Sequence, residues 1–237
     1  MKTELIIALD FSENSDAVNM VKRISDAGRF YKVGLELFIS CGGRLIPTLK
    51  DMGKKVFLDL KLHDIPNTVR GALLASLKYG ADIVNVHIQG GREMLKLCSD
   101  TCKEYAIKSG FSPKIIGVTL LTSLSEDYLR EYGISAASPK EYVIKLAKFA
   151  KDAGLDGVVS SAQESREIKE ACGGSFIIIS PGIRFNDGSL DDQQRASAPQ
   201  FAARNGVDYI VVGRPITHSH DPAWETERFY SALRQTV

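Results

Sequence analysis

Residues 55–64 read Lys-Val-Phe-Leu-Asp-Leu-Lys-Leu-His-Asp, a run in which leucines alternate with charged side chains. Successive side chains of a β-strand point to opposite faces of the sheet, so Asp59 and Lys61 are predicted to share one face. The leucines around them are predicted to share the other face. The stretch therefore predicts a strand that carries two opposite charges on one side.

Similar short runs of aliphatic and β-branched residues recur along the whole chain, and each is followed by a charged stretch of helical character. The eight predicted strands cover residues 5–11, 31–35, 55–61, 82–87, 114–121, 157–161, 176–180 and 209–213. Several follow a Gly-x-Asp turn, in which glycine suits the end of the preceding helix. This alternation predicts parallel strands joined by crossover helices.

The length of the chain agrees with eight strand–helix units in one domain. It has 237 residues, of which 44% are hydrophobic, enough for a large core. We predict an α/β protein with a single (β/α)8 TIM barrel spanning residues 1–237. An open, doubly wound sheet is the alternative architecture.

Composition and charge exclude several classes of partner. The 30 Lys and Arg residues nearly balance the 29 Asp and Glu residues, so the net charge of +1 argues against a nucleic-acid partner. The longest uncharged stretch, residues 171–183, is shorter than the roughly 18 residues of a membrane span. Residues 5–9 form an apolar run too short and too closely flanked by acids for a secretory signal. We expect a cytoplasmic protein without a membrane or nucleic-acid partner.

Cysteines and histidines offer two weak candidates for metal binding. The cysteines are Cys41, Cys98, Cys102 and Cys172. They are too few for a disulfide scaffold, and we expect reduced thiols. Cys98 and Cys102 could share a metal on one helix, but no third ligand lies nearby, so buried thiols are favoured. His218 and His220 could bind a metal together with His87, although surface histidines are favoured. No metal site is therefore predicted.

In barrels of this kind, reacting groups lie where the strands end, at the carboxyl face. Polar residues gather at the predicted strand ends, namely Asp10, Lys32, Asp59, Lys61, His87, Thr122, Ser123 and Arg214. A single charge at such a position can simply face water. The set as a whole predicts a site.

Asp59 and Lys61 are the most informative members of this set. Burying an anion and a cation is costly unless each has a partner, so the pattern indicates an ion pair that a polar ligand completes. A purely structural ion pair is the alternative. With Lys32 and Asp64 nearby, alternating charges would keep each group ionised. A lysine held as an ammonium donates a proton and stabilises negative charge, and it cannot form a Schiff base, so we predict that Lys61 faces a developing carbanion. Asp64 could instead be an acid at the entry of the next helix.

A phosphate site is predicted at the last strand. Gly213 would allow close backbone approach to a phosphate, and Arg214 would bind its oxygens. Barrel enzymes often hold phosphate with the loops after the seventh and eighth strands. Arg184 and Gln193 lie in the long connection at residues 180–197, which we interpret as a lid.

The segment at residues 59–68, Asp-Leu-Lys-Leu-His-Asp-Ile-Pro-Asn-Thr, resembles the orotidine 5′-monophosphate decarboxylase family. Shorter matches extend the resemblance over essentially the whole chain, at residues 8–10, 32–34, 181–184 and 212–216. The ten-residue segment is highly specific, whereas the Gly-Arg pair alone is not.

The resemblance implies decarboxylation of orotidine 5′-monophosphate to uridine 5′-monophosphate, the last step of de novo synthesis of that nucleotide, without a metal or organic cofactor. It implies that Lys61 donates a proton to C6 of the pyrimidine and that Asp59 lies near the departing carboxylate. Lys32 and Asp64 complete the charged network, with Asp64 contributed by the other subunit of a homodimer.

The same resemblance implies the contacts to the nucleotide substrate. Asp10 and Lys32 approach the ribose together with Thr68, which comes from the other subunit. Thr122 and Asp59 lie at the pyrimidine and its carboxylate. The residues implied to hold the phosphate are Arg184, Gln193, Gly213 and Arg214.

Two other functions remain open from the sequence. The sugar-phosphate enzymes 3-keto-L-gulonate 6-phosphate decarboxylase and hexulose-6-phosphate synthase share the barrel and a similar Asp-x-Lys-x-x-Asp motif, but they stabilise an enediolate with Mg²⁺. The continuation at residues 63–68 and the predicted lid favour the nucleotide. A catalytically silent sensor of nucleotide phosphates is the other alternative.

Overall fold

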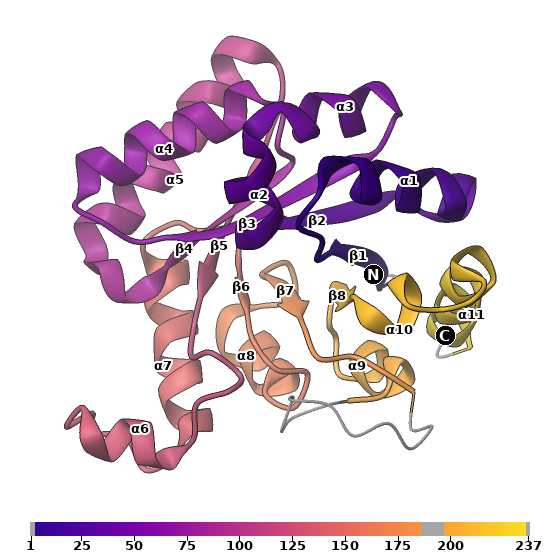
Figure 1. Cartoon of the computed structure of the whole chain (residues 1–237). Helices are drawn as coiled ribbons and strands as arrows, with labels where there is room; N and C mark the ends of the chain where they lie inside the picture. Colours follow the sequence, from indigo (N-terminus) through magenta and orange to yellow (C-terminus); the bar gives the residue numbers. More distant parts are fainter. Residues whose placement is uncertain (1–2, 186–196, 236–237) are drawn as a thin grey trace.

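The computed structural model of the chain describes residues 3–185 and 197–235. In these residues, eight parallel strands follow one another around a closed barrel, and β1 pairs with β8 to close it. The strands are β1 (Glu4–Leu9), β2 (Phe30–Gly34), β3 (Lys55–Leu62), β4 (Ile83–His87), β5 (Lys114–Val118), β6 (Gly157–Val159), β7 (Ile177–Ser180) and β8 (Tyr209–Val212). This arrangement confirms the predicted (β/α)8 TIM barrel and excludes the open sheet (Figure 1).

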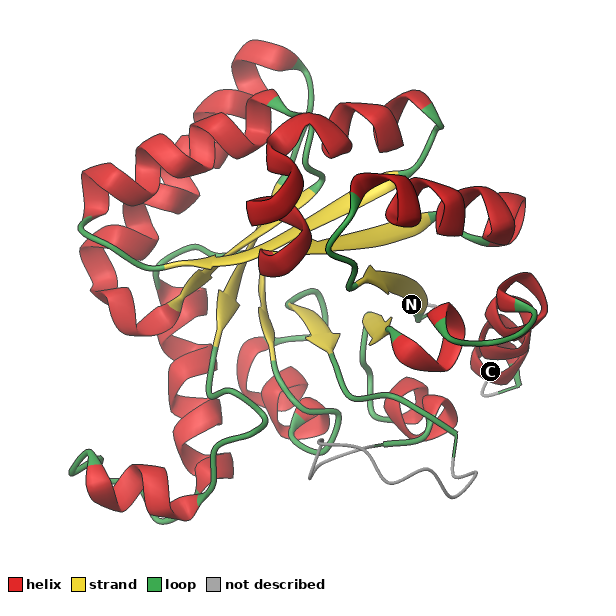
Figure 2. Cartoon of the chain, in the orientation of Figure 1, coloured by secondary structure: helices red, strands yellow, loops and turns green. Residues whose placement is uncertain are grey.

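Helices cover the outside of the barrel, as Figure 2 shows in red around the yellow strands. The α-helices are α1 (Asn14–Ile24), α2 (Leu35–Cys41), α3 (Leu45–Asp51), α4 (Pro66–Lys78), α5 (Gly91–Ser109), α6 (Glu126–Glu131), α7 (Pro139–Asp152), α8 (Ser165–Cys172), α9 (Pro199–Arg204), α10 (Arg214–Thr217) and α11 (Pro222–Arg234). Short 3-10 helices lie at Ser25–Ala27, Gly42–Arg44 and Ile88–Gly90. Several helices begin at a proline, whose fixed φ suits the first turn; Ser138 and Asp221 also cap α7 and α11 by accepting backbone N–H groups.

The alternation of side chains along each strand produces two separate cores. On β1, Leu5, Ile7 and Leu9 pack outward against the helices, while Ile6 and Ala8 point into the barrel. The inner core consists of Ile6, Ala8, Phe30, Phe57, Ile83, Ile116, Ile179 and Val211. These side chains fill the barrel interior, so polar groups farther along the strands lie above an apolar floor.

The Gly-x-Asp turns tie the amino ends of the strands together. In each turn the aspartate accepts a hydrogen bond from a backbone N–H of the preceding strand and pairs with a lysine. The aspartate, N–H and lysine groups are Asp82 with Val56 and Lys50, Asp156 with Ile115 and Lys114, and Asp208 with Ile178 and Lys169. The turns therefore strengthen the end of the barrel opposite the predicted site.

All eight predicted strands are present, but some of their ends were wrong. The strand predicted at residues 114–121 ends at Val118. Beyond it, Thr119 bonds through its hydroxyl to Val159 O, and the chain turns so that Leu120 and Leu121 line a cavity. Similarly, Leu35 begins α2 instead of ending β2, and the first strand stops at Leu9, one residue before Asp10. Apolar residues in these loops extended the predicted strands too far.

All four cysteines are free thiols, as expected. Burial raises the pKa of the Cys98 and Cys102 thiols on α5 to about 12. Among the described residues, no three His, Cys, Asp or Glu side chains form a group that could hold a metal ion. Within the same residues, no helix is long and apolar enough to cross a membrane.

Candidate active site

Three adjoining cavities lie at the carboxyl end of the barrel. The first has a volume of about 230 Å³ and contains Lys32, Asp59 and Lys61. These three residues also line a second cavity of about 190 Å³, which reaches Asp10. Asp10 in turn lines a third cavity of about 130 Å³. Together the three cavities form a cleft across the mouth of the barrel.

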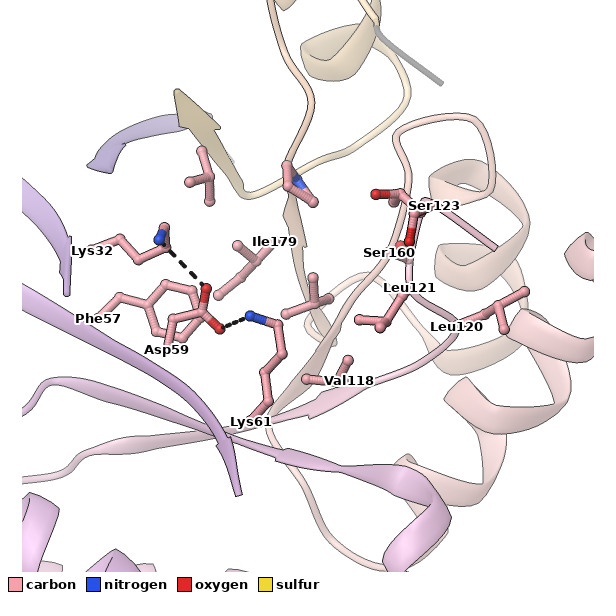
Figure 3. Close-up of a pocket in the computed structure, with 14 residues that line it drawn as sticks. Lys32, Phe57, Asp59, Lys61, Val118, Leu120, Leu121, Ser123, Ser160 and Ile179 are labelled. Carbon is pink, nitrogen blue, oxygen red and sulfur yellow. Dashed lines mark hydrogen bonds and ion pairs between the residues drawn. The ribbon is translucent and has the colours of Figure 1, made fainter. Parts of the chain in front are cut away.

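Figure 3 shows the charged side chains of Lys32, Asp59 and Lys61 close together in the first cavity, with apolar side chains around them. Its apolar wall includes Phe57, Val118, Leu120, Ile179 and Val211. Thr122, Ser123 and Ser160 add hydroxyl groups to the lining. This lining suits a heterocycle with polar edges, because apolar side chains can pack against the ring while hydroxyl groups bond to its edge.

The charged side is a chain of alternating charges. Lys61 Nζ lies 2.7 Å from Asp59 Oδ1, and Lys32 Nζ lies 3.7 Å from Asp59 Oδ2 and 3.0 Å from Asp10 Oδ1. The Asp59 and Lys32 side chains are only 13% and 12% exposed, whereas that of Lys61 is 30% exposed. The structure thus brings together four residues that the sequence placed on three strand ends.

The charge state of Asp59 follows from these contacts. Burial alone raises the pKa of a carboxyl group. For Asp59 this effect is outweighed by the ammonium groups of Lys32 and Lys61 and by hydrogen bonds from Lys61 and Asn85, so the pKa of Asp59 lies below its ordinary value. Asp59 is therefore an anion at neutral pH.

Lys61 has an unusual backbone. Its φ is +51°, in the left-handed region that non-glycine residues rarely adopt. At this point the pairing of β3 with β4 is irregular: Leu58 pairs with Val84 and Leu62 pairs with Val86. Three residues of β3 therefore face one residue of β4, Asn85, and β3 bulges. Such bulges commonly redirect side chains near active sites.

Asn85 and Gly34 also contribute to the site, although neither was predicted from the sequence as a site residue. Asn85 is fully buried on β4 and contacts both Asp59 and Lys61. The available signal was a lone amide in the apolar run Ile-Val-Asn-Val-His, at an inward position. Gly34 ends β2, and a Cβ there would lie 2.9 Å from Lys32 Nζ, so the glycine leaves room for that ammonium group.

The third cavity contains most of the predicted phosphate-binding residues. Gly182, Arg184, Gly213 and Arg214 line it together with Asp10. A Cβ on Gly213 would lie 3.2 Å from Asp10 Oδ2, so only glycine fits easily there. Arg184 Nη1 is buried and has no hydrogen-bond partner among the described residues, which leaves it available to an anion.

The predicted lid, residues 180–197, lies partly outside the described residues. Gln193 is in the part that is not described. Its described ends are joined: Arg184 N–H donates to Ser197 O and Ser197 N–H donates to Gly182 O, both at 3.1 Å. This bridge holds Arg184 next to the end of β7.

Asp64 and Thr68 do not line any of the three cavities. Both are exposed, and Asp64 Oδ1 accepts a hydrogen bond from Ile65 N–H at 2.6 Å, just before α4. This contact matches the helix-entry alternative for Asp64. Within one chain these two residues are thus outside the cleft, and Ile65 between them is 68% exposed.

The histidines lie apart from a metal-binding arrangement. The rings of His63 and His87 lie 5.5 Å apart beside the cleft. His218 and His220 are both exposed beyond β8. The two residues are therefore surface histidines, as expected.

Comparisons with known proteins point to one family. A family model described as "Orotidine 5'-phosphate decarboxylase / HUMPS family" matches residues 3–229. A curated orotidine 5′-phosphate decarboxylase of Carboxydothermus hydrogenoformans is 47% identical over 91% of this chain and 90% of that protein. One from Fusobacterium nucleatum is 44% identical over 94% of this chain and 92% of that protein.

Solved structures that are similar to this chain carry the same family name. A crystal structure of orotidine 5′-phosphate decarboxylase from Lactobacillus acidophilus has a TM-score of 0.86 and 36% identity, covering 98% of this chain and 99% of that one. A structure of orotidine 5′-monophosphate decarboxylase from Methanocaldococcus jannaschii, complexed with the inhibitor BMP, has a TM-score of 0.75 and 27% identity with the same coverage.

Proposed function

The chain belongs to the orotidine 5′-phosphate decarboxylase / HUMPS family, and from this premise we propose that it is a carboxy-lyase that converts orotidine 5′-monophosphate to uridine 5′-monophosphate and CO₂. This reaction is the last step of de novo synthesis of that nucleotide. We assign the whole chain, as one catalytic domain, to this reaction. The curated relatives that carry the name support the nucleotide as substrate.

The observation that carries the proposal is the contact of Lys61 with Asp59 inside an apolar cavity. When the bond from C6 to the carboxylate breaks, CO₂ leaves and the electron pair remains at C6 in an orbital in the plane of the ring. The π system of the ring cannot delocalise that pair, so stabilisation must come from outside the ring. An ammonium group fixed by Asp59 at 2.7 Å supplies it.

Lys61 then completes the reaction as a proton donor. A proton passes from its Nζ to C6, which gives uridine 5′-monophosphate, and the lysine regains a proton from solvent. Because the ammonium position is fixed before the substrate binds, little reorganisation is needed as the charge develops. Asp59 would lie beside the departing carboxylate, and Lys32 would keep Asp59 oriented while contacting the ribose with Asp10.

The phosphate end of the cleft supports a nucleotide monophosphate. Arg184 and Arg214 line one cavity together with Gly182 and Gly213, and Arg184 has a buried nitrogen without a hydrogen-bond partner among the described residues. Binding energy from this remote phosphate can hold the pyrimidine against the charged chain. Gln193 is assigned to the same phosphate from its sequence position, and Thr122 to the pyrimidine.

We assign a homodimer to the active form. Asp64, Ile65 and Thr68 are exposed together at the mouth of the barrel, which supports contact with a second chain. In that assembly Asp64 would join the charged network of the other subunit, and Thr68 would reach its ribose. The four free thiols support a reducing compartment, and we assign the enzyme to the cytoplasm.

The test is the loss of orotidine 5′-monophosphate absorbance after addition of protein stripped of metals with EDTA. We expect turnover without added metal. Turnover that requires Mg²⁺, with a keto-sugar phosphate as the better substrate, would favour the sugar-phosphate alternative. Tight binding of 6-substituted uridine monophosphates without release of CO₂ would favour a sensor.

A further inference from the structure

A fully buried amide connects the two residues on which the proposed reaction depends. Asn85 Nδ2 donates a hydrogen bond of 2.7 Å to Asp59 Oδ1. Its Oδ1 accepts a hydrogen bond of 2.8 Å from Lys61 N–H. Asn85 is 0% exposed. Unlike the charged residues, it does not line the cavity, so it acts through them and does not touch the substrate.

The acceptor half of the amide replaces a bond of the sheet. Where three residues of β3 face only Asn85 on β4, the regular ladder between the two strands is interrupted. A buried N–H without a hydrogen-bond partner destabilises the folded state. The Asn85 side chain satisfies the Lys61 N–H at this point and so stabilises the bulge, including the left-handed φ of Lys61.

The donor half of the amide orients the carboxylate. Asp59 Oδ1 receives two hydrogen bonds, from Asn85 Nδ2 and from Lys61 Nζ, both 2.7 Å long. Two donors at one oxygen restrict rotation of the carboxylate, which in turn restricts the ammonium group. Only a side chain with one donor and one acceptor in a planar group meets both demands here.

We propose that Asn85 is a positioning residue: through one amide it fixes the Asp59 carboxylate and the Lys61 backbone, and thereby sets where the Lys61 ammonium lies. The inference rests on the proposed function, because it concerns the geometry of the proton donor. It assigns no contact with the nucleotide to Asn85.

Three variants test the two halves of the amide. Asn85→Ala removes both hydrogen bonds, and Asn85→Leu removes them while keeping a side chain that branches at Cγ. Asn85→Asp keeps the shape but places a second carboxylate against Asp59. Ser99→Ala is the control, because Ser99 is a buried residue of α5 away from the cleft and the substitution removes one hydrogen bond, from Ser99 Oγ to Gly154 O.

Asn85→Ala and Asn85→Leu should lower kcat about 100-fold, as expected when a reacting group is misplaced by about 1 Å. KM and the Kd of uridine 5′-monophosphate should change by less than about threefold, because the phosphate contacts are elsewhere. Ser99→Ala should lower Tm without this loss. A folded Asn85→Ala with kcat within about threefold of wild type, or a kcat loss equal to that of Ser99→Ala, would overturn the inference.

The pH profile gives a readout that a merely structural role would not move. Among the described residues, three titratable groups interact electrostatically with Asp59. Lys32 on β2 and Lys61 on β3 lower the pKa of Asp59, and Asp59 in turn raises the pKa of His87 on β4. Without the Asn85 donor the pKa of Asp59 should rise, so the acidic limb of the kcat profile in Asn85→Ala should move to higher pH.

Asn85→Asp should show the opposite behaviour. When the paired carboxyl groups share a proton, the protonated Asp side chain can donate to Asp59 and accept from Lys61 N–H, as the amide does. Its kcat should therefore increase as pH falls from neutral. If Asn85→Ala and Asn85→Leu fail to fold, this variant decides, and a profile parallel to wild type would overturn the inference. A wild-type protein that does not decarboxylate orotidine 5′-monophosphate would instead overturn the proposed function, and this inference with it.

Discussion

Lys61 Nζ and Asn85 Nδ2 bond to the same oxygen of Asp59, each at 2.7 Å. Oδ2 of that carboxylate remains toward Lys32, 3.7 Å away. The carboxylate therefore holds one ammonium closely and a second one loosely. Lys32 is also paired with Asp10, at 3.0 Å, so each ammonium group has one close carboxylate partner.

Replacing Lys61 tests its role as proton donor. Lys61→Ala should lower kcat by more than about 10³-fold, because both the preorganised charge and the proton are lost. The fold should remain, as measured by circular dichroism. The matched control is Lys50→Ala, because the Lys50 side chain is also 30% exposed and its ammonium pairs with Asp82 at 2.6 Å near the other end of the barrel. A wild-type kcat in folded Lys61→Ala would exclude this residue as the donor.

The phosphate end can be tested separately from the chemistry. Arg214→Ala should lower kcat/KM about 10- to 100-fold, which corresponds to one hydrogen bond to a charged group. Free guanidinium in the assay should restore part of the activity. Arg204→Ala, an exposed arginine on α9, is the control. Unchanged kcat/KM in Arg214→Ala would remove this residue from the phosphate site.

Sharing of sites between subunits predicts complementation. Lys61→Ala and Asp64→Asn should each be inactive alone. In a mixed dimer, one site carries both substitutions and the other carries neither, so random exchange should restore about a quarter of wild-type activity. Mixtures as inactive as the separate variants, after subunit exchange has been shown by mass spectrometry, would argue against a shared site.

His87 predicts a pH dependence of folding. Burial lowers the pKa of His87, and nearby His63 and Lys61 lower it further, against a raising effect of Gln89. A folded-state pKa below the unfolded value of about 6.5 means that the unfolded chain binds a proton first as pH falls. The free energy of unfolding should therefore decrease below about pH 6.5. The decrease should be shallower in His87→Gln than in wild type or in the exposed control His218→Gln, as measured by urea denaturation at several pH values. If the free energy of unfolding decreased equally with pH in all three proteins, the predicted contribution of His87 would be wrong.

The fold was predictable because buried parallel strands need runs of mostly aliphatic residues, and eight such runs are visible in the sequence. Strand ends were less predictable. A run of apolar residues looks the same in the sequence whether it continues a strand or forms a loop that lines a cavity. Leu120 and Leu121 were therefore assigned to a strand that in fact ends at Val118.

The pairing of Asp59 with Lys61 could be predicted from the alternation of side chains. The bulge at Lys61 could not, because its left-handed φ results from the pairing of β3 with β4 and not from a local glycine. Asn85 was not predicted for the same reason. The role of an amide inside an apolar strand can be inferred only once its two hydrogen-bond partners on the neighbouring strand are known. The positions of Asp64 and Thr68 relative to a substrate depend on a second chain, which no pattern within one chain specifies.

Because the backbone at Lys61 is left-handed, the residue that would make the fold most stable at this position is not the residue that the reaction needs. Glycine adopts this conformation without the steric cost that a Cβ brings, so Lys61→Gly should be more stable than Lys61→Ala by about 1 kcal/mol. A directed-evolution screen that scores survival at high temperature alone would tend to discard the lysine. Only a screen that also scores product, such as growth without supplied pyrimidine, would keep it.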